Sequence, residues 1–348
     1  MKMLSGYTPA CPWEMVVQSS MVRRYSDPSD YIRDFKWSKA DFCITARGQF
    51  SSKRTRISLP RVLLHRYSEE LPRVGHIDHA PDRALFMFAT RTGPSWFTSA
   101  TEIPPGAIVR FGKEDQSFQR STGRLESGAV SMSIDEIEAI GATYGASDFK
   151  PPQNTLIVSP TPSMARLQRI HAIAGQLAEH ASEVIEVPQA ARGLEQALLA
   201  AMAECLSAPE DGAKEVGSRH RNMIMKRFYA LLEAHPDGVL HALEVCKAIG
   251  ASRRTLTTCC NETLGMSPHR YLKLRQLHLV RRALRQADPL LATVTTVATE
   301  HGFWDLGRFA SAYRRLFGEL PSATLHLGAK AAPGAWEHEN FMLASKNT

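Results

Sequence analysis

The feature that most constrains this chain is a repeat within its last third. Each copy has apolar residues at steps of four, followed by a glycine and a proline. The first copy comprises Leu256, Cys260, Leu264, Gly265 and Pro268, and the second, 53 positions later, comprises Phe309, Tyr313, Phe317, Gly318 and Pro321. Apolar residues at that spacing share one helical face, and glycine commonly ends a helix. The sequence therefore predicts two similar helices, capped by Ser252 and Asp305.

A shorter match lies just before each of these helices. The pattern Cys246-x-x-x-Gly250 corresponds to Ala298-x-x-x-Gly302. A small residue suits the contact between two crossing helices, and a glycine allows the sharp turn between them. Each copy is thus predicted to be a helix-turn-helix unit.

The second helix of each unit is expected to present one face to solvent. In the first unit this face comprises Arg253, Arg254, Thr257 and Thr258, and in the second it comprises Leu306, Gly307, Arg308 and Ser311, with Arg314 and Arg315 further along. The helix predicted over 268–286 would separate the units by roughly 28 Å, at about 1.5 Å per residue. Successive major grooves on one side of DNA lie about 34 Å apart. We therefore expect both units to bind double-stranded DNA together.

The charge of the chain supports a polyanionic partner for this region. The formal net charge of +7 divides into +3 for residues 1–160, −4 for 161–217 and +8 for 218–348. Arg281, Arg282 and Arg285 on the connecting helix, with Arg314 and Arg315, suit phosphate contacts.

The segment HGFWDLGRFASAYRRLFGELPSATLH at 301–326 resembles the signature of AraC/XylS-family transcription regulators, especially the subgroup of ethanolamine-operon and aromatic-catabolism regulators. The resemblance covers residues 219–327. It implies a C-terminal DNA-binding domain and an N-terminal domain that senses an effector or dimerises. It also implies that the two outward faces read bases, with Arg254 as our candidate for a direct base contact. Many members carry arginine where Ser311 stands, and phenylalanine where Cys260 stands.

The N-terminal region is expected to be rich in β-structure. Runs over 42–50, 55–66, 84–90 and 106–111 predict short strands of a small cupin-like barrel or sandwich, and 133–144 predicts a helix capped by Ser133. The predicted fold class is therefore α+β. We divide the chain into an effector domain (1–160), a helical pair (161–206), a linker (207–218), the DNA-binding domain (219–327) and a loose tail (328–348).

The helical pair carries one apolar stripe on each helix. The stripe comprises Leu167, Ile170, Ala174, Leu177, Leu194 and Leu198. The residues alone allow it to pack on its own barrel. The family resemblance implies a dimer contact, so we expect a homodimer.

Candidates for effector binding are Arg47 and Arg110, which could hold a carboxylate, and Trp96. His76, Asp78 and His79 suggest a metal site, but the two histidines would face opposite sides of a strand, and no glutamate follows at a matching spacing. We therefore expect a surface loop there and no metal or other cofactor. No catalytic constellation is recognisable, so we do not expect an enzyme.

Other features indicate a cytoplasmic protein. No apolar stretch approaches the ~20 residues that cross a bilayer, the N-terminus lacks a signal-peptide core, and the six cysteines form no C-x-x-C pair. We expect buried free thiols.

The sequence thus predicts a transcription regulator, an activator by family analogy, with promoter DNA, a small-molecule effector and RNA polymerase as partners. Two alternatives stay open. One is a ligand-independent factor whose barrel only dimerises. The other is a cupin-like enzyme fused to a DNA-binding domain.

Overall fold

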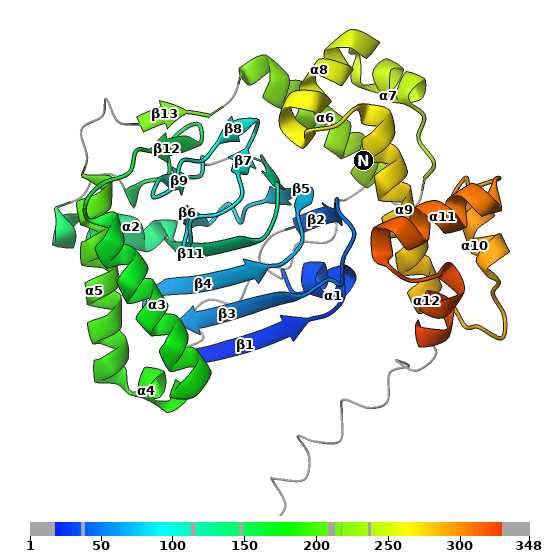
Figure 1. The fold of residues 1–348 in the computed structure, drawn as a ribbon. Coiled ribbons are helices and arrows are strands. Elements are labelled where there is room, and N and C mark those ends of the chain that lie inside the picture. Colours follow the sequence, from blue (N-terminus) through cyan, green and yellow to red (C-terminus); the bar gives the residue numbers. More distant parts are fainter. Residues whose placement is uncertain are drawn as a thin grey trace, which may run out of the picture.

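The computed structural model describes residues 18–35, 39–112, 116–145, 149–207, 213–216, 218–235 and 238–328. Two antiparallel sheets make up the N-terminal part, and helices make up the C-terminal part (Figure 1). This arrangement confirms the predicted α+β class. Among the described residues, no helix is both long enough and apolar enough to cross a membrane. Cys11 and the tail beyond residue 328 lie outside the described residues.

The larger sheet has the strand order β1-β3-β4-β11-β6-β9-β12-β13 within the described residues. Its strands are β1 (Ser19–Tyr25), β3 (Ser52–Ser58), β4 (Val62–Glu69), β6 (Arg83–Ala89), β9 (Ile108–Arg110), β11 (Leu125–Ser133), β12 (Leu156–Val158) and β13 (Ala213–Glu215). The strand predicted over 55–66 is wrong in one respect, because it is interrupted around Pro60. There the backbone N–H of Leu59 donates to the carbonyl of Val62 at 2.9 Å and closes a hairpin turn between β3 and β4.

The smaller sheet has the order β2-β5-β10-β7-β8, again among the described residues. Its strands are β2 (Lys39–Ile44), β5 (Arg73–Asp78), β10 (Gln116–Ser121), β7 (Trp96–Thr98) and β8 (Thr101–Glu102). The surface loop predicted around His76 is therefore wrong. His76 lies within β5 and is only 1% exposed, because β2 and β10 pair with β5 on its two sides.

Helices cover the outer face of the larger sheet (Figure 1). They are α2 (Ile134–Tyr144), α3 (Met164–His180), α4 (Ser182–Glu186) and α5 (Pro188–Leu206), while α1 (Pro28–Arg33) lies at the opposite end of β1. The N-cap prediction for α2 is confirmed, because the Ser133 hydroxyl accepts from the Asp135 N–H. Part of the predicted linker is instead β13, which pairs with β12.

The apolar stripe of α3 and α5 lies in the core of this chain. Leu167, Ala174 and Leu198 are fully buried against the sheet, and Ile170, Leu177 and Leu194 pack against the same cluster. The predicted dimer contact is therefore wrong for Leu167, Ala174 and Leu198, because burial against the chain's own sheet leaves them no apolar surface for a partner. For the half-buried Ile170, Leu177 and Leu194 it stays a prediction.

The C-terminal part is a series of helices around one long helix, α9 (Figure 1). They are α6 (Arg219–Ala234), α7 (Ala242–Ile249), α8 (Arg253–Leu264), α9 (Pro268–Gln286), α10 (Val294–Glu300), α11 (Leu306–Phe317) and α12 (Pro321–Gly328). The two helices predicted from the repeat are confirmed, because α8 and α11 occupy the same positions 53 residues apart.

The two parts share buried surface. Cys43 and Phe118 of the smaller sheet belong to the same apolar cluster as Phe228 and Tyr229 of α6. A second contact joins α9 to β2, where the ring nitrogen Nε2 of His278 lies 3.3 Å from the carbonyl of Ile44. Burial lowers the pKa of His278 to about 4, so the neutral ring donates this bond at pH 7. The C-terminal helices are therefore docked on the smaller sheet.

Candidate nucleic-acid interface

The two candidate recognition helices begin in the same way. The hydroxyl of Ser252 accepts from the N–H of Thr255 at 3.0 Å, and the carboxylate of Asp305 accepts from the N–H of Arg308 at 3.0 Å. These caps satisfy backbone donors that a helix otherwise leaves unpaired at its start. Each helix therefore has a defined first residue, which fixes the side chains of its first turn in space.

A glycine makes the turn before each recognition helix. Gly250 has φ +66° and Gly302 has φ +82°, both in the left-handed region that favours glycine. A Cβ on Gly302 would also lie 2.9 Å from the side chain of Val239. The turn glycines predicted from the repeat thus have the conformation that a helix-turn-helix needs.

The outward face of α8 is largely open to solvent. Arg253, Arg254 and Thr258 are exposed, and Thr257 is half-buried. Their positions in the first turns of a capped helix match those that enter a major groove in helix-turn-helix proteins. The structure places these four predicted residues together.

The outward face of α11 differs in one member. Gly307, Arg308, Ser311, Arg314 and Arg315 are exposed. Leu306 instead packs partly against the apolar cluster beneath the helix, so its placement on the outward face is only half right.

The Arg308 guanidinium lies 3.2 Å from the Asp305 carboxylate and remains 84% exposed. Such an exposed pair is weak, so Arg308 can exchange this partner for another anion.

Trp304 is a surface residue that the sequence reasoning missed. Its side chain is 85% exposed, directly before the cap of α11, although aromatic residues in such a segment more often belong to a core. The neighbouring core position is occupied by Phe303, and its ring centroid lies 4.8 Å from that of Phe309. The useful signal was the repeat itself, because the corresponding position 53 residues earlier is the small Ala251.

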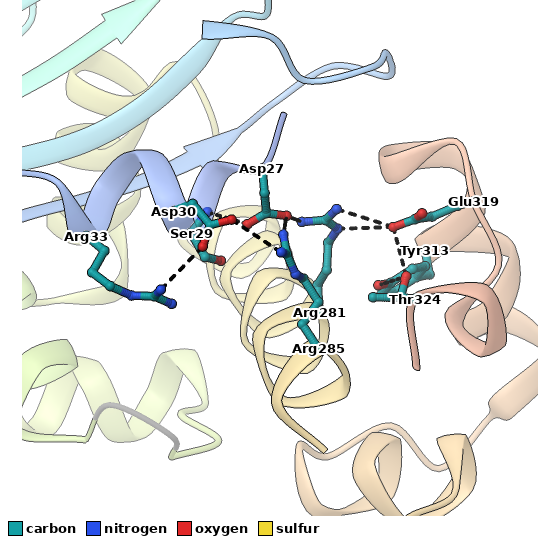
Figure 2. Close-up of polar contacts among 9 residues, drawn as sticks. All are labelled: Asp27, Ser29, Asp30, Arg33, Arg281, Arg285, Tyr313, Glu319 and Thr324. Carbon is teal, nitrogen blue, oxygen red and sulfur yellow. Dashed lines mark hydrogen bonds and ion pairs between the residues drawn. The ribbon is translucent and has the colours of Figure 1, made fainter. Parts of the chain in front are cut away.

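Two of the arginines predicted to contact phosphates are half-buried and paired with carboxylates of the protein itself. Figure 2 shows Arg281 and Arg285 of α9 converging on Asp27, the N-cap of α1, with Asp30 beside Arg285 at 3.3 Å. On its other side, Arg281 lies 3.3 Å from the carboxylate of Glu319. Carboxylates hold both arginines in this structure, so the predicted phosphate contacts would require their release.

The two arginines keep the buried carboxylate of Asp27 ionised. Burial by itself would raise the pKa of Asp27, but the charges of Arg281 and Arg285 outweigh it and keep that pKa below its usual value. Asp27 is 3% exposed and accepts, in addition, from the N–H of Ser29 at 2.8 Å. Asp27 is therefore ionised at neutral pH, and the cluster joins the first described helix of the chain to α9.

The first helix-turn-helix unit also touches the N-terminal part. Helix α8 packs against β10, and Arg221 of α6 donates to both Glu262 of α8 (2.7 Å) and the carbonyl of Ser99 (3.3 Å). The core of the second unit instead shares an apolar cluster with Ile44 of β2. The two units thus sit in different surroundings.

The candidate effector residues are not brought together. Arg47 is exposed in the loop after β2, Trp96 is buried in β7, and Arg110 is buried with its guanidinium donating to the carbonyl of Lys150 at 3.0 Å. None of them lines the cavity between the two sheets. That cavity is lined by Tyr31, Phe35, Arg54, Leu63, His65, Tyr67, Arg73, Ile77, His79, Ala80, Arg83, Leu85, Met87, Ala129 and Ser131.

Comparison with known proteins agrees with this geometry. A helix-turn-helix domain family matches residues 245–326. The chain is 43% identical over 106 residues to "XylDLEGF operon transcriptional activator 2" of Pseudomonas putida, a match covering 30% of this chain and 68% of that protein. It is 33% identical over 157 residues to "Probable thc operon regulatory protein" of Rhodococcus erythropolis, covering 43% of this chain and about half (47%) of that protein.

Among solved structures, the AraC-like transcriptional activator CuxR is similar over 81% of this chain and all of its own, with 17% identity and a TM-score of 0.37. Two helix-turn-helix units joined by one helix, beside a β-rich part, define a class of bacterial regulators. This chain belongs to the AraC/XylS family of transcription regulators, which confirms the resemblance found in its sequence.

Proposed function

We propose that this protein is an effector-responsive transcriptional activator that binds promoter DNA through α8 and α11 in successive major grooves. The observation that carries the proposal is the pair of capped recognition helices, whose exposed faces include Arg253, Arg254 and Arg308. A bidentate arginine contact to guanine is the commonest specific contact in the major groove. Arg314 and Arg315 suit the adjacent phosphates.

We place the effector in the cavity between the two sheets. Three arginines (Arg54, Arg73 and Arg83) line it together with Tyr31, Phe35 and Tyr67, and none of the lining side chains is a carboxylate. Arg54 and Arg73 are buried and Arg83 is half-buried, and arginines beside aromatic rings favour a small anion with an apolar body.

Unused donors in the cavity support this choice. The Nη1 atom of Arg73 is buried and has no hydrogen-bond partner among the described residues, although its Nε donates to Glu69 at 2.8 Å. Burial lowers the pKa of His65, so that ring is neutral at pH 7. The cavity measures about 80 Å³, whereas a single water needs roughly 10–15 Å³. A compact carboxylate fits this space better than a long chain does.

Helix α1 couples this cavity to the DNA-binding part. Tyr31 lines the cavity and donates to Glu69 at 2.7 Å, while its neighbour Asp30 and the cap Asp27 hold Arg285 and Arg281. An effector that displaces Tyr31 would move the same short helix. The arginines of α9 would then be free for DNA phosphates, which gives a physical route from effector binding to DNA binding.

We also propose a second copy of this chain and RNA polymerase as partners. We propose a homodimer through the outer faces of α3 and α4 and the α4–α5 junction, where Ile173, Val184 and Val187 are between 37% and 47% exposed. As an activator it would also contact RNA polymerase. We propose that it works in the cytoplasm and is not an enzyme, in keeping with relatives that are named as regulators.

Selection of binding sites from a random pool of duplexes tests the proposal directly. The full chain is expected to enrich two short motifs whose centres lie about 10–10.5 base pairs apart, one for each recognition helix. Its affinity should fall steeply with salt, as counterion release from phosphates requires. Failure to enrich any sequence would contradict the proposal.

Thermal unfolding separates effector binding from the ligand-independent alternative. A library of small carboxylates should contain compounds that raise the melting temperature, because a ligand that binds only the folded state stabilises it. Arg73→Gln should abolish that shift, whereas Arg47→Gln, in the exposed loop, should not. A shift that persists in Arg73→Gln would move the effector site elsewhere.

A further inference from the structure

An open cleft of about 560 Å³ lies between the smaller sheet and the C-terminal helices. His76 of β5 and Glu233 of α6 line it, and Asp78 follows His76 by two positions on the same strand. Alternate residues of a strand point to the same face, so His76 and Asp78 face α6 together. The proposed function uses none of these three side chains.

The three side chains converge on one point. The Nε2 atom of His76 lies 3.0 Å from a carboxylate oxygen of Asp78, and all three ligand atoms, including one from Glu233, lie within 4.8 Å of one another. Ligand atoms about 2.0–2.2 Å from a shared ion are necessarily separated by no more than about 4.4 Å. Small side-chain adjustments therefore bring all three within reach of a single ion.

The packing around His76 fixes this geometry. The centroid of its ring lies 4.8 Å from the ring centroid of Tyr229 and 5.8 Å from that of Phe118. Tyr229 and Glu233 are four residues apart on α6, hence on one face of that helix. The aromatic contact that docks α6 on the sheet is thus the same contact that brings the Glu233 carboxylate over the strand.

We propose that His76, Asp78 and Glu233 form a binding site for a divalent transition-metal ion that bridges the N-terminal and C-terminal parts. One imidazole and two carboxylates are a ligand set suited to Zn²⁺, Mn²⁺, Fe²⁺ or Co²⁺, and the absence of a thiolate among them disfavours Cu⁺. The cleft leaves the remaining coordination positions to water. Asp41, directly opposite His76 in the register of β2 and β5, also lines the cleft and could bind such a water.

Three arginines in the cleft limit the affinity of the site for a cation. Arg33, Arg275 and Arg282 also line it. Arg275 is directed at the end of α6, where it donates to the carbonyl of Leu232 at 3.1 Å. Asp41 and Glu233 in the cleft, with Asp78 beside His76, offset the charge of these arginines in number.

Sequence reasoning missed this site for a definite reason. The motif around His76 lacked a downstream glutamate at a spacing typical of one barrel. The third proposed ligand, Glu233, lies 155 positions after Asp78, on a helix of the other part, and only the docking of α6 brings it close.

A metal titration of the full chain tests the proposal without DNA, so its outcome is independent of the proposed function. After treatment with a chelator, the chain is titrated with Zn²⁺ by calorimetry and with Co²⁺ by absorption. We expect one ion per chain, a higher melting temperature when the ion is bound, and a Co²⁺ spectrum without the near-ultraviolet band of thiolate ligands. That band distinguishes this site from adventitious binding to the free cysteines.

Matched variants identify the ligands. Glu233→Gln, at an exposed position, should weaken Zn²⁺ binding at least about tenfold, the lower end of the loss seen even for residues behind a ligand. Asp78→Asn should do the same, and Glu300→Gln, an exposed glutamate on α10, should leave the affinity unchanged. His76→Ala should abolish binding, with circular dichroism reporting whether this buried position still folds. The absence of saturable binding, equal affinities in Glu233→Gln and Glu300→Gln, or a thiolate spectrum would each overturn the proposal.

Discussion

The two helix-turn-helix units share a pattern but differ in their surroundings. The first is docked on the smaller sheet, with α8 against β10 and Glu262 held by Arg221. In the second, the positions that match Asn261 and Glu262 are Arg314 and Arg315, both exposed. The comparison shows that a repeated fold can present different chemistry. The first unit carries Arg253 and Arg254 at the start of α8, and Glu262 near the end of that helix pairs with Arg221. The second unit carries Arg314 and Arg315 near the end of α11, and both are exposed.

The cores of the two units offer the largest contrast. Tyr313→Ala should lower the free energy of unfolding by about 3–5 kcal/mol, because it removes a fully buried aromatic ring. Cys260→Ala, at the equivalent position of the first unit, should cost only about 1 kcal/mol. Equilibrium urea unfolding measures both. Equal losses would show that the first unit depends on its small cysteine as much as the second depends on its ring.

Base recognition should separate the two helices. Arg254→Ala is expected to remove about 1–3 kcal/mol of discrimination at one base pair, because it deletes a side chain placed to read a base edge. Arg315→Ala should weaken binding to all sequences alike and reduce the dependence of affinity on salt by about one phosphate. Binding to a panel of single-base duplex variants distinguishes these outcomes. A uniform loss in Arg254→Ala would reassign that residue to the phosphate backbone.

Releasing α9 should affect both units together. Asp27→Asn removes the negative charge that holds Arg281 and Arg285, so DNA affinity should rise about tenfold and its salt dependence should steepen by about two phosphates. The melting temperature should fall, because a buried charge cluster loses its centre. Asp135→Asn, at an exposed position of α2, is the control. Unchanged DNA binding in Asp27→Asn would show that these arginines do not contact phosphates.

Trp304 should give the smallest effect. Trp304→Ala should change the free energy of unfolding by no more than about 0.5 kcal/mol, because the side chain is exposed. We expect DNA binding to weaken modestly, since the indole stands beside the first turn of α11 and its counterpart Ala251 offers no such contact. Anisotropy titrations measure this effect, with Leu290→Ala, at a 91% exposed position, as the control. An unchanged affinity would assign Trp304 to a protein partner.

Local patterns predicted the C-terminal part closely. Caps, turn glycines and apolar steps of four are all encoded within one or two helical turns, so α8 and α11 could be placed to the residue. The strands were less exact, since the periodicity from Thr55 to Arg66 continues through the turn at Pro60. The buried stripe of α3 was identified correctly, but periodicity alone cannot say whether a stripe packs on its own sheet or on another chain.

Contacts across long sequence separations could not be predicted at all. Asp27 and Arg281 are 254 residues apart, and their pairing depends on how the C-terminal helices dock on the smaller sheet. The same docking brings Glu233 to His76. An arginine on a basic helix suggests phosphate contacts, and nothing nearby in the sequence reveals a carboxylate that competes for it.

Helix α1 has a consequence for how far a signal must travel. Allosteric communication is often pictured as a path of packed side chains over tens of ångströms, and such paths are hard to demonstrate. Here Tyr31, at the cavity, and Asp30, at the arginines of α9, are joined by a single peptide bond. Sensing and response would then share one rigid six-residue body. A rotation or displacement of α1 alone would then connect the cavity to the arginines of α9, and no other part of the barrel would have to change conformation.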